Sequence, residues 1–155
     1  MKKVPELDDP LFYVEKFLPK DFFLPDYDYY VFHSSQQPWL EGEKALKEIL
    51  KQWEENKRVL EPLFKRRETE EVKKVMIASI ALFLQYLFWS NEQPVNLNVL
   101  KDQVNQLKVK PINAMERLGF IMNRPMLHHS YIQLKELFVE QEKAYYKYLT
   151  IKKRL

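Results

Sequence analysis

The chain has 155 residues, of which 46% are hydrophobic and 30% charged, so it can form one folded domain with a substantial core. It has two glycines and no cysteine, which excludes Gly-rich phosphate loops, disulfide bonds, thiolate zinc sites and a thiol nucleophile. The net charge of +3 is uneven, because residues 1–40 carry four lysines against seven acidic residues, whereas residues 92–155 carry eleven basic against six acidic residues. An acidic head and a basic tail can attract different partners or each other.

The chain begins with a segment rich in proline and aromatic residues. Residues 1–40 hold five of the nine prolines and ten aromatic side chains. Because proline lacks an amide donor and restricts the residue before it, we expect at most one short helix, near residues 11–17. We predict a mostly extended arm, residues 1–37, packed on a helical domain, residues 38–155. Whether the arm aromatics belong to the core, to a partner interface or to a homodimer stays open.

Two long helices are predicted next. Apolar residues recur with a period near 3.6 between residues 46 and 64, which indicates an amphipathic helix that Pro62 kinks or ends. The following helix, over residues 69–90, is apolar nearly all round and is expected at the centre of the fold. Its apolar run, 75–89, is shorter than the roughly 18–20 residues of a membrane span, so we predict no membrane span.

Three further helices complete the prediction. Their expected ranges are 97–107, 113–122 and 130–152, and Pro94, Pro111 and Pro125 separate them. No internal repeat and no strand pattern is present. The predicted fold class is therefore all-α, a single domain of about five helices with an N-terminal arm.

A motif lies within residues 110–145. Its features are Pro111, Asn113, Glu116, Arg117, Leu118, Phe120, Ile121, Arg124, Pro125, Tyr131, Ile132, Gln133 and Leu134. This motif resembles the YpoC-like family of small uncharacterised proteins from Bacillus-type bacteria. The resemblance implies no activity, no cofactor and no role for a particular residue.

The same stretch contains the densest polar cluster of the chain. The candidate residues for a ligand or partner groove are Asn113, Glu116, Arg117, Arg124, His129 and Gln133. Arginines beside two predicted helix N-termini are suited to an anion, a phosphate group or a peptide. This pattern predicts a preformed groove.

A structural explanation accounts for the same residues. Asn113 and Glu116 have the N-x-x-E spacing of a capping box, and Ser130 and Gln133 offer a second one for the next helix. Arg117 would then pair with a carboxylate. Both explanations stay open at this point.

No residues suggest a catalytic, metal or cofactor site. The adjacent His128 and His129 diverge by about 100° on a helix, and His33 is isolated among aromatics, so we expect no metal ion. Asp26 and Asp28 lie in the arm, where we expect neither the burial nor the cleft that a catalytic carboxylate needs. An enzyme is expected only through an unrecognised site.

The sequence therefore favours a non-catalytic, cytoplasmic helical module that binds another protein. The acidic residues that follow Lys2 and Lys3 argue against an export signal. The alternative is a nucleic-acid-associated domain that uses the basic C-terminal half, where Lys152, Lys153 and Arg154 are consecutive. In a third possibility, the acidic arm neutralises that basic half within the same molecule.

Overall fold

The computed structural model describes residues 3–154, and within them the fold is all-α, as predicted. The elements in chain order are η1 (Pro5–Leu7), η2 (Pro10–Phe12), α1 (Pro19–Phe22), α2 (Leu24–Phe32), η3 (Pro38–Leu40), α3 (Glu43–Lys65), α4 (Thr69–Trp89), α5 (Leu100–Asn105), α6 (Ala114–Asn123) and α7 (His128–Arg154), where η is a 3-10 helix.

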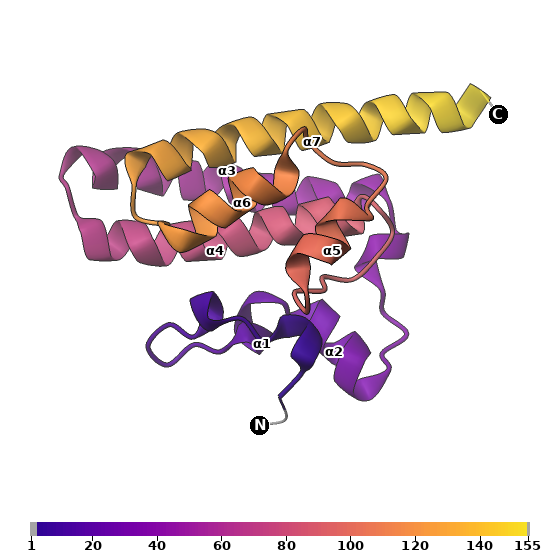
Figure 1. Cartoon of the computed structure of the whole chain (residues 1–155), viewed down its shortest axis with the longest axis horizontal. Helices are drawn as coiled ribbons and strands as arrows, with labels where there is room; N and C mark the ends of the chain where they lie inside the picture. Colours follow the sequence, from indigo (N-terminus) through magenta and orange to yellow (C-terminus); the bar gives the residue numbers. More distant parts are fainter. Residues whose placement is uncertain (1–2, 155) are drawn as a thin grey trace.

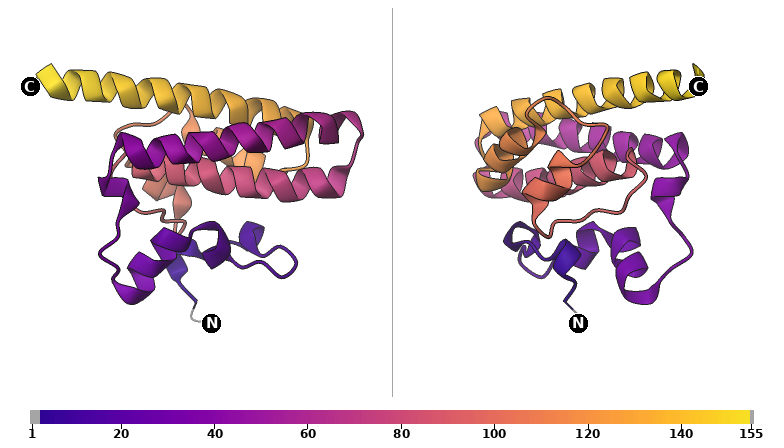
Figure 2. Two further views of the ribbon diagram at one scale, coloured as in Figure 1. Left: turned by 180° about the vertical axis from the view of Figure 1, so that it is seen from behind. Right: turned by 45° about the vertical axis from the view of Figure 1, so that its right-hand side comes forward.

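The helices form layers around α4. Helices α3 and α4 lie antiparallel and side by side, and α7 lies along one side of this pair with α6 packed against it (Figure 1). The arm occupies the opposite side, beneath α4, in all views (Figures 1 and 2). The arm and α7 are therefore separated by the α3–α4 pair.

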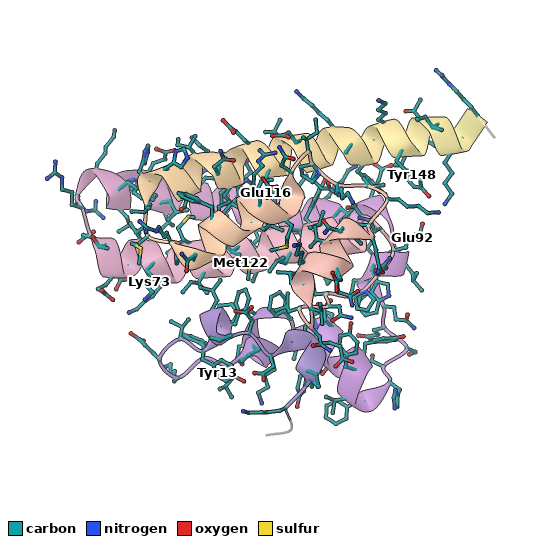
Figure 3. All side chains as sticks on the ribbon, viewed as in Figure 1. Tyr13, Lys73, Glu92, Glu116, Met122 and Tyr148 are labelled. Atoms are coloured by element: carbon teal, nitrogen blue, oxygen red, sulfur yellow. The ribbon has the colours of Figure 1, made fainter. Side chains whose placement is uncertain are left out.

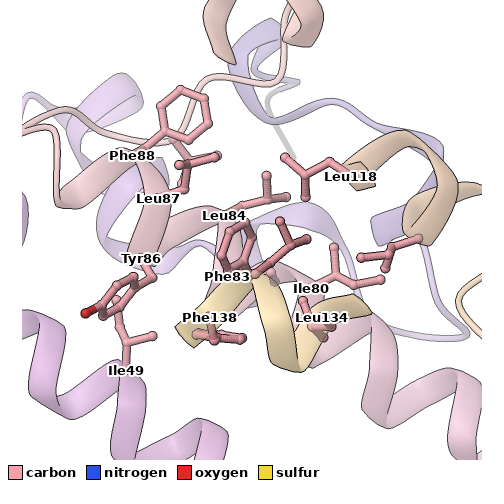
Figure 4. Packing of buried hydrophobic residues seen from close by; sticks show 14 of the residues in the cluster. Ile49, Ile80, Phe83, Leu84, Tyr86, Leu87, Phe88, Leu118, Leu134 and Phe138 are labelled. Carbon is pink, nitrogen blue, oxygen red and sulfur yellow. The ribbon is translucent and has the colours of Figure 1, made fainter. Parts of the chain in front are cut away.

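Helix α4 supplies the centre of the core. Ile80, Phe83 and Leu84 have no exposed surface, and Figure 4 shows them beside Leu134 and Phe138 of α7. By length and hydropathy α4 could cross a membrane, but 72% of its apolar window is buried inside the protein. Burial by the other helices accounts for its apolar character on all sides.

The prediction of a mostly extended arm with at most one short helix was wrong in its local structure. The described arm consists of turns and short helices, among them the nine-residue α2. Every helix of the described arm carries a proline in its first turn, at Pro5, Pro10, Pro19 or Pro25, and η3, which follows the arm, begins with Pro38 in the same way. The first turn has no internal partner for its amides, so proline begins a helix there without losing a hydrogen bond.

The predicted ranges of the long helices are confirmed. Helix α3 continues through Pro62 to Lys65, so Pro62 does not end it, whereas α4 begins at Thr69 as expected and α7 reaches Arg154. Helix α5 is shorter than its predicted range, 97–107, and covers only six residues.

Both predicted capping boxes are absent. Asn113 does precede α6, but its backbone is left-handed with φ of 55° and its side chain makes no cap hydrogen bond. Asparagine tolerates this conformation better than most residues, which explains its presence there. Ser130 lies inside α7, which begins at His128, and its hydroxyl donates to the Arg124 carbonyl at 2.6 Å.

Candidate functional site

Arg117 is the centre of the polar cluster that the sequence predicted. From α6 its guanidinium donates to both carboxylate oxygens of Glu140 on α7, at 2.9 and 2.6 Å. It also donates to the Gln133 side chain at 3.1 Å and to the Ile112 carbonyl at 3.0 Å. These bonds join α6 to α7 and occupy the guanidinium N–H donors that an anion would need.

The electrostatics of this pair agree with its geometry. The hydrogen bond from Arg117 lowers the pKa of Glu140 below its ordinary value, and the same bond raises the pKa of Arg117. Both groups are therefore ionised at neutral pH. The predicted pairing of Arg117 with a carboxylate is confirmed.

The other predicted site residues surround Arg117 unequally. Gln133 is half-buried and bound to Arg117, whereas Arg124 lies just past the end of α6 and is exposed. Glu116 is exposed on α6 (Figure 3). The exposed His129 ring packs edge-on against the Phe120 ring, with 5.3 Å between the ring centroids. A partner site on these residues stays a prediction, and the contacts of Arg117 favour its structural role.

Asp26 is a second polar centre, which the sequence analysis missed. Its side chain on α2 is fully buried, contrary to our expectation for an arm residue. The carboxylate accepts hydrogen bonds from Gln85 Nε2 at 3.1 Å, Trp89 Nε1 at 2.9 Å and the Val95 amide at 2.7 Å. We call this set of four residues the Asp26 clasp. It fastens the arm to α4 and to the segment that follows α4.

Two further bonds support the same attachment. The Tyr30 hydroxyl, one turn after Asp26, donates to the Val95 carbonyl at 2.8 Å. The Leu97 amide donates to the Glu6 carbonyl of η1 at 2.6 Å. The segment after α4 is thus held by the arm through backbone and side-chain bonds.

An open groove lies beside the clasp, between the arm and the α3–α4 pair. Its volume is about 430 Å³, and we call it the arm groove. It is lined by Asp21, Phe22, Leu24, Pro25, Pro38, Glu41, Lys44, Ala45, Glu48, Ile49, Gln52, Leu82, Gln85 and Trp89. Its charged residues are three acids and one lysine, so it is apolar with a net negative rim.

A smaller polar cavity of about 260 Å³ lies just past the C-terminal end of α4, where residues 90–93 meet Tyr148 of α7. Glu92 and Tyr148 mark it in Figure 3. Its wall is held by Asn91, whose side chain bonds both the amide and the carbonyl of Val109 at 2.8 Å. Gln141 adjoins this wall, fully buried, with one side-chain oxygen that has no protein partner.

The arm does not neutralise the basic C-terminal part of the chain. The two regions lie on opposite sides of the α3–α4 pair (Figure 2). Among residues 3–154, the arm acid that forms an ion pair is Glu15, with Lys74 of α4 at 2.9 Å. Residues 143–154 of α7 contain five basic and no acidic residues. The interpretation of intramolecular neutralisation is therefore wrong.

Comparison with known proteins identifies the family. A model of the YpoC-like protein family matches residues 43–153, from the start of α3 to the end of α7. The chain belongs to the YpoC-like family. A Bacillus subtilis (strain 168) relative, "Uncharacterized protein YpoC", is 33% identical over 112 residues, which cover 72% of this chain and 68% of that protein. No solved structure matches the chain.

The family match covers the helices α3 to α7 and does not cover the arm. The matched residues build the helical layers that contain Arg117 and Glu140, whereas Asp26 and the arm lie outside the match. The YpoC-like name states no activity, so the family match assigns no function to this chain. The local feature of Asp26 is its place in the aromatic run 22–32, but Asp28 lies in the same run, so the sequence does not single out Asp26.

Proposed function

We propose that this protein is a non-catalytic helical module that binds another protein, and that the partner docks in the arm groove. The observation that supports this proposal is an open apolar groove beside a concentration of exposed apolar side chains on the arm. Leu24 lines the groove and is 55% exposed, and Phe17 and Phe32, elsewhere on the arm, are 46% and 69% exposed. An open apolar groove with exposed apolar side chains at its edge is typical of interaction sites.

The rim of the groove indicates the chemistry of the partner. Asp21, Glu41 and Glu48 are exposed around the apolar floor, and Lys44 is the opposing charge. A complementary partner presents apolar side chains flanked by basic residues. A single helix or an extended segment of such composition is the occupant that we propose.

The test uses two matched substitutions of exposed apolar residues. A photo-crosslinking residue at position 24 identifies the partner, which is then purified and titrated against Leu24→Asp and Val139→Asp proteins. Val139 is 50% exposed on α7, far from the groove, and serves as the control. We expect Leu24→Asp to weaken binding by about tenfold or more. Equal affinities of the two variants, or the absence of any crosslinked partner, contradict the proposal.

A second candidate function has one observation of its own. The C-terminal end of α7 extends beyond the other helices (Figure 1). Residues 143–154 of α7 carry five basic and no acidic side chains, and Lys143 and Lys147 share one face at i,i+4 spacing. This surface is suited to the phosphates of a nucleic acid. A labelled oligonucleotide titrated at low and moderate salt tests it: binding with a steep salt dependence supports this function, and no binding at low salt eliminates it.

A further inference from the structure

The Asp26 clasp is unusual because it holds a buried carboxylate without a cation. Asp26 has no exposed surface, and its three protein donors, from Gln85, Trp89 and Val95, are all neutral. Among residues 3–154, no lysine, arginine or histidine forms an ion pair with it. A buried charge without a partner is costly, so ionisation of this carboxyl opposes docking of the arm.

The ionisable groups near the clasp do not compensate this charge. Tyr30 lies on the same helix, and burial together with Asp26 and Glu6 raises its pKa, so it stays neutral. Glu6, from η1, adds a second negative charge to the neighbourhood. Burial likewise raises the pKa of Asp26, although its hydrogen bonds from Trp89, Val95 and Gln85 oppose the change. The docked arm therefore favours the protonated carboxyl more than a free arm does.

The clasp and the arm groove share side chains. Gln85 and Trp89 donate to Asp26 and also line the groove, and Pro25 lines it from the residue before Asp26. When the clasp opens, the arm wall and the α4 wall of the groove separate. The arrangement of the groove is therefore coupled to the hydrogen bonds of Asp26.

We propose that the Asp26 clasp is a pH-responsive fastening that holds the arm on α4 and thereby sets the shape of the arm groove. Asp26 acts as a positioning residue: it contacts Gln85 and Trp89 and does not line the groove itself. In the protonated form the carboxyl O–H donates to the Gln85 amide oxygen once that amide turns over, and the other carboxyl oxygen still accepts from Trp89 and Val95. Rising pH removes this proton, leaves a buried charge without a counter-ion and loosens the clasp. The part that concerns the groove rests on the proposed function, whereas the fastening of the arm does not.

The experiment reads the clasp directly, without a partner. The indole Nε1–H resonance of Trp89, assigned by Trp89→Phe, is followed by NMR between about pH 4 and pH 8, together with exchange protection of the α2 amides. In the unmodified protein we expect the resonance to titrate, and the protection factors to fall by up to about tenfold per pH unit as the carboxyl ionises.

Two variants separate the clasp from general stability. Asp26→Asn keeps the shape and satisfies the donors once the Gln85 amide turns over, so we expect a resonance and protection factors that do not change with pH. Asp28→Asn is the control two residues away, half-buried and without a side-chain hydrogen bond among the described residues, and it should titrate like the unmodified protein. The fastening is overturned if the Trp89 resonance and the α2 protection factors of the unmodified protein do not change with pH. It is also overturned if those of Asp26→Asn still change.

The link to the groove is tested with the crosslinked partner. We expect Asp26→Leu, which leaves three donors without an acceptor, to lower both α2 protection and partner affinity by at least about tenfold. Asp26→Asn should restore both. If Asp26→Leu does not fold, the partner affinity of Asp26→Asn against pH decides: its pH dependence should be flat where that of the unmodified protein is not. If the Trp89 resonance titrates but Asp26→Leu and Asp26→Asn bind the partner as the unmodified protein does, the fastening stands and only its coupling to the groove is contradicted.

Discussion

Asp26 and Arg117 are two polar centres of the described structure, and each joins two parts of the fold through a different kind of contact. Arg117 lies between α6 and α7, with a side chain that is 18% exposed, and faces the Glu140 carboxylate. Asp26 lies between the arm and α4 with no exposed surface and faces only neutral donors. One charge is paired near water, and the other is buried and held by hydrogen bonds alone.

This difference gives the two joints opposite responses to ionisation. The Arg117 guanidinium lowers the pKa of Glu140, so the charged form strengthens the α6–α7 joint. Burial raises the pKa of Asp26, so the charged form weakens the attachment of the arm. The family-matched helices are thus joined by a contact that favours charge, and the arm by a contact that does not.

The largest effect is expected from Asp26→Leu. The substitution leaves the donors of Gln85, Trp89 and Val95 without an acceptor, and each unsatisfied buried donor costs about 1–3 kcal/mol. We expect the free energy of unfolding, measured in urea, to fall by about 3 kcal/mol or more. Asp28→Leu, on the same helix, is the control. If both variants lose the same free energy of unfolding, the hydrogen bonds of the clasp contribute nothing specific to stability.

A smaller effect is expected from Arg117→Met. It removes two bonds to Glu140 but leaves a carboxylate that is 40% exposed and can be hydrated. We expect a loss of about 1–2 kcal/mol in the same urea measurement. A double-mutant cycle with Glu140→Gln isolates the pair, and a coupling energy near zero would mean that the contact only positions the helices.

The layers of the fold could be predicted because their signals are local and periodic. The 3.6-residue repeat placed α3, and the apolar run placed α4 at the centre, where the structure has it. The arm was mispredicted because proline was treated only as a helix breaker. Its position in the first turn, as at Pro19, makes it a helix initiator instead.

The two polar centres differ in predictability for a related reason. Arg117 belongs to a dense polar cluster, so composition alone draws attention to it. The capping spacing beside it was misleading, because Asn113 uses its left-handed backbone and not its side chain. Asp26 depends on Gln85 and on Val95, which is 69 residues away in the chain, and no local pattern reports such contacts.

The pH dependence of stability should separate the two centres by sign. The contribution of Glu140 is present above its ordinary pKa and is lost as pH falls through the lowered value. The contribution of Asp26 is largest at low pH and is lost as pH rises through the raised value. The free energy of unfolding, measured in urea across pH, should therefore fall less steeply at acid pH in Glu140→Gln. In Asp26→Asn it should no longer decline as pH rises. The same change in both variants contradicts the assignment.

The smallest effect on stability is expected from Arg124→Ala and His129→Ala. Both side chains are exposed, and such substitutions usually change the free energy of unfolding by about 0.5 kcal/mol or less. Their value lies in the second measurement, the affinity for the crosslinked partner. If the partner contacts the predicted cluster, these variants weaken binding without changing the urea midpoint, whereas Leu24→Asp does not. If the partner occupies the arm groove, the order reverses, because only Leu24 and its neighbours touch it. Because both substitutions are expected to leave the fold nearly as stable as before, a loss of binding in these variants cannot be attributed to unfolding, and it would place the partner on the α6–α7 side.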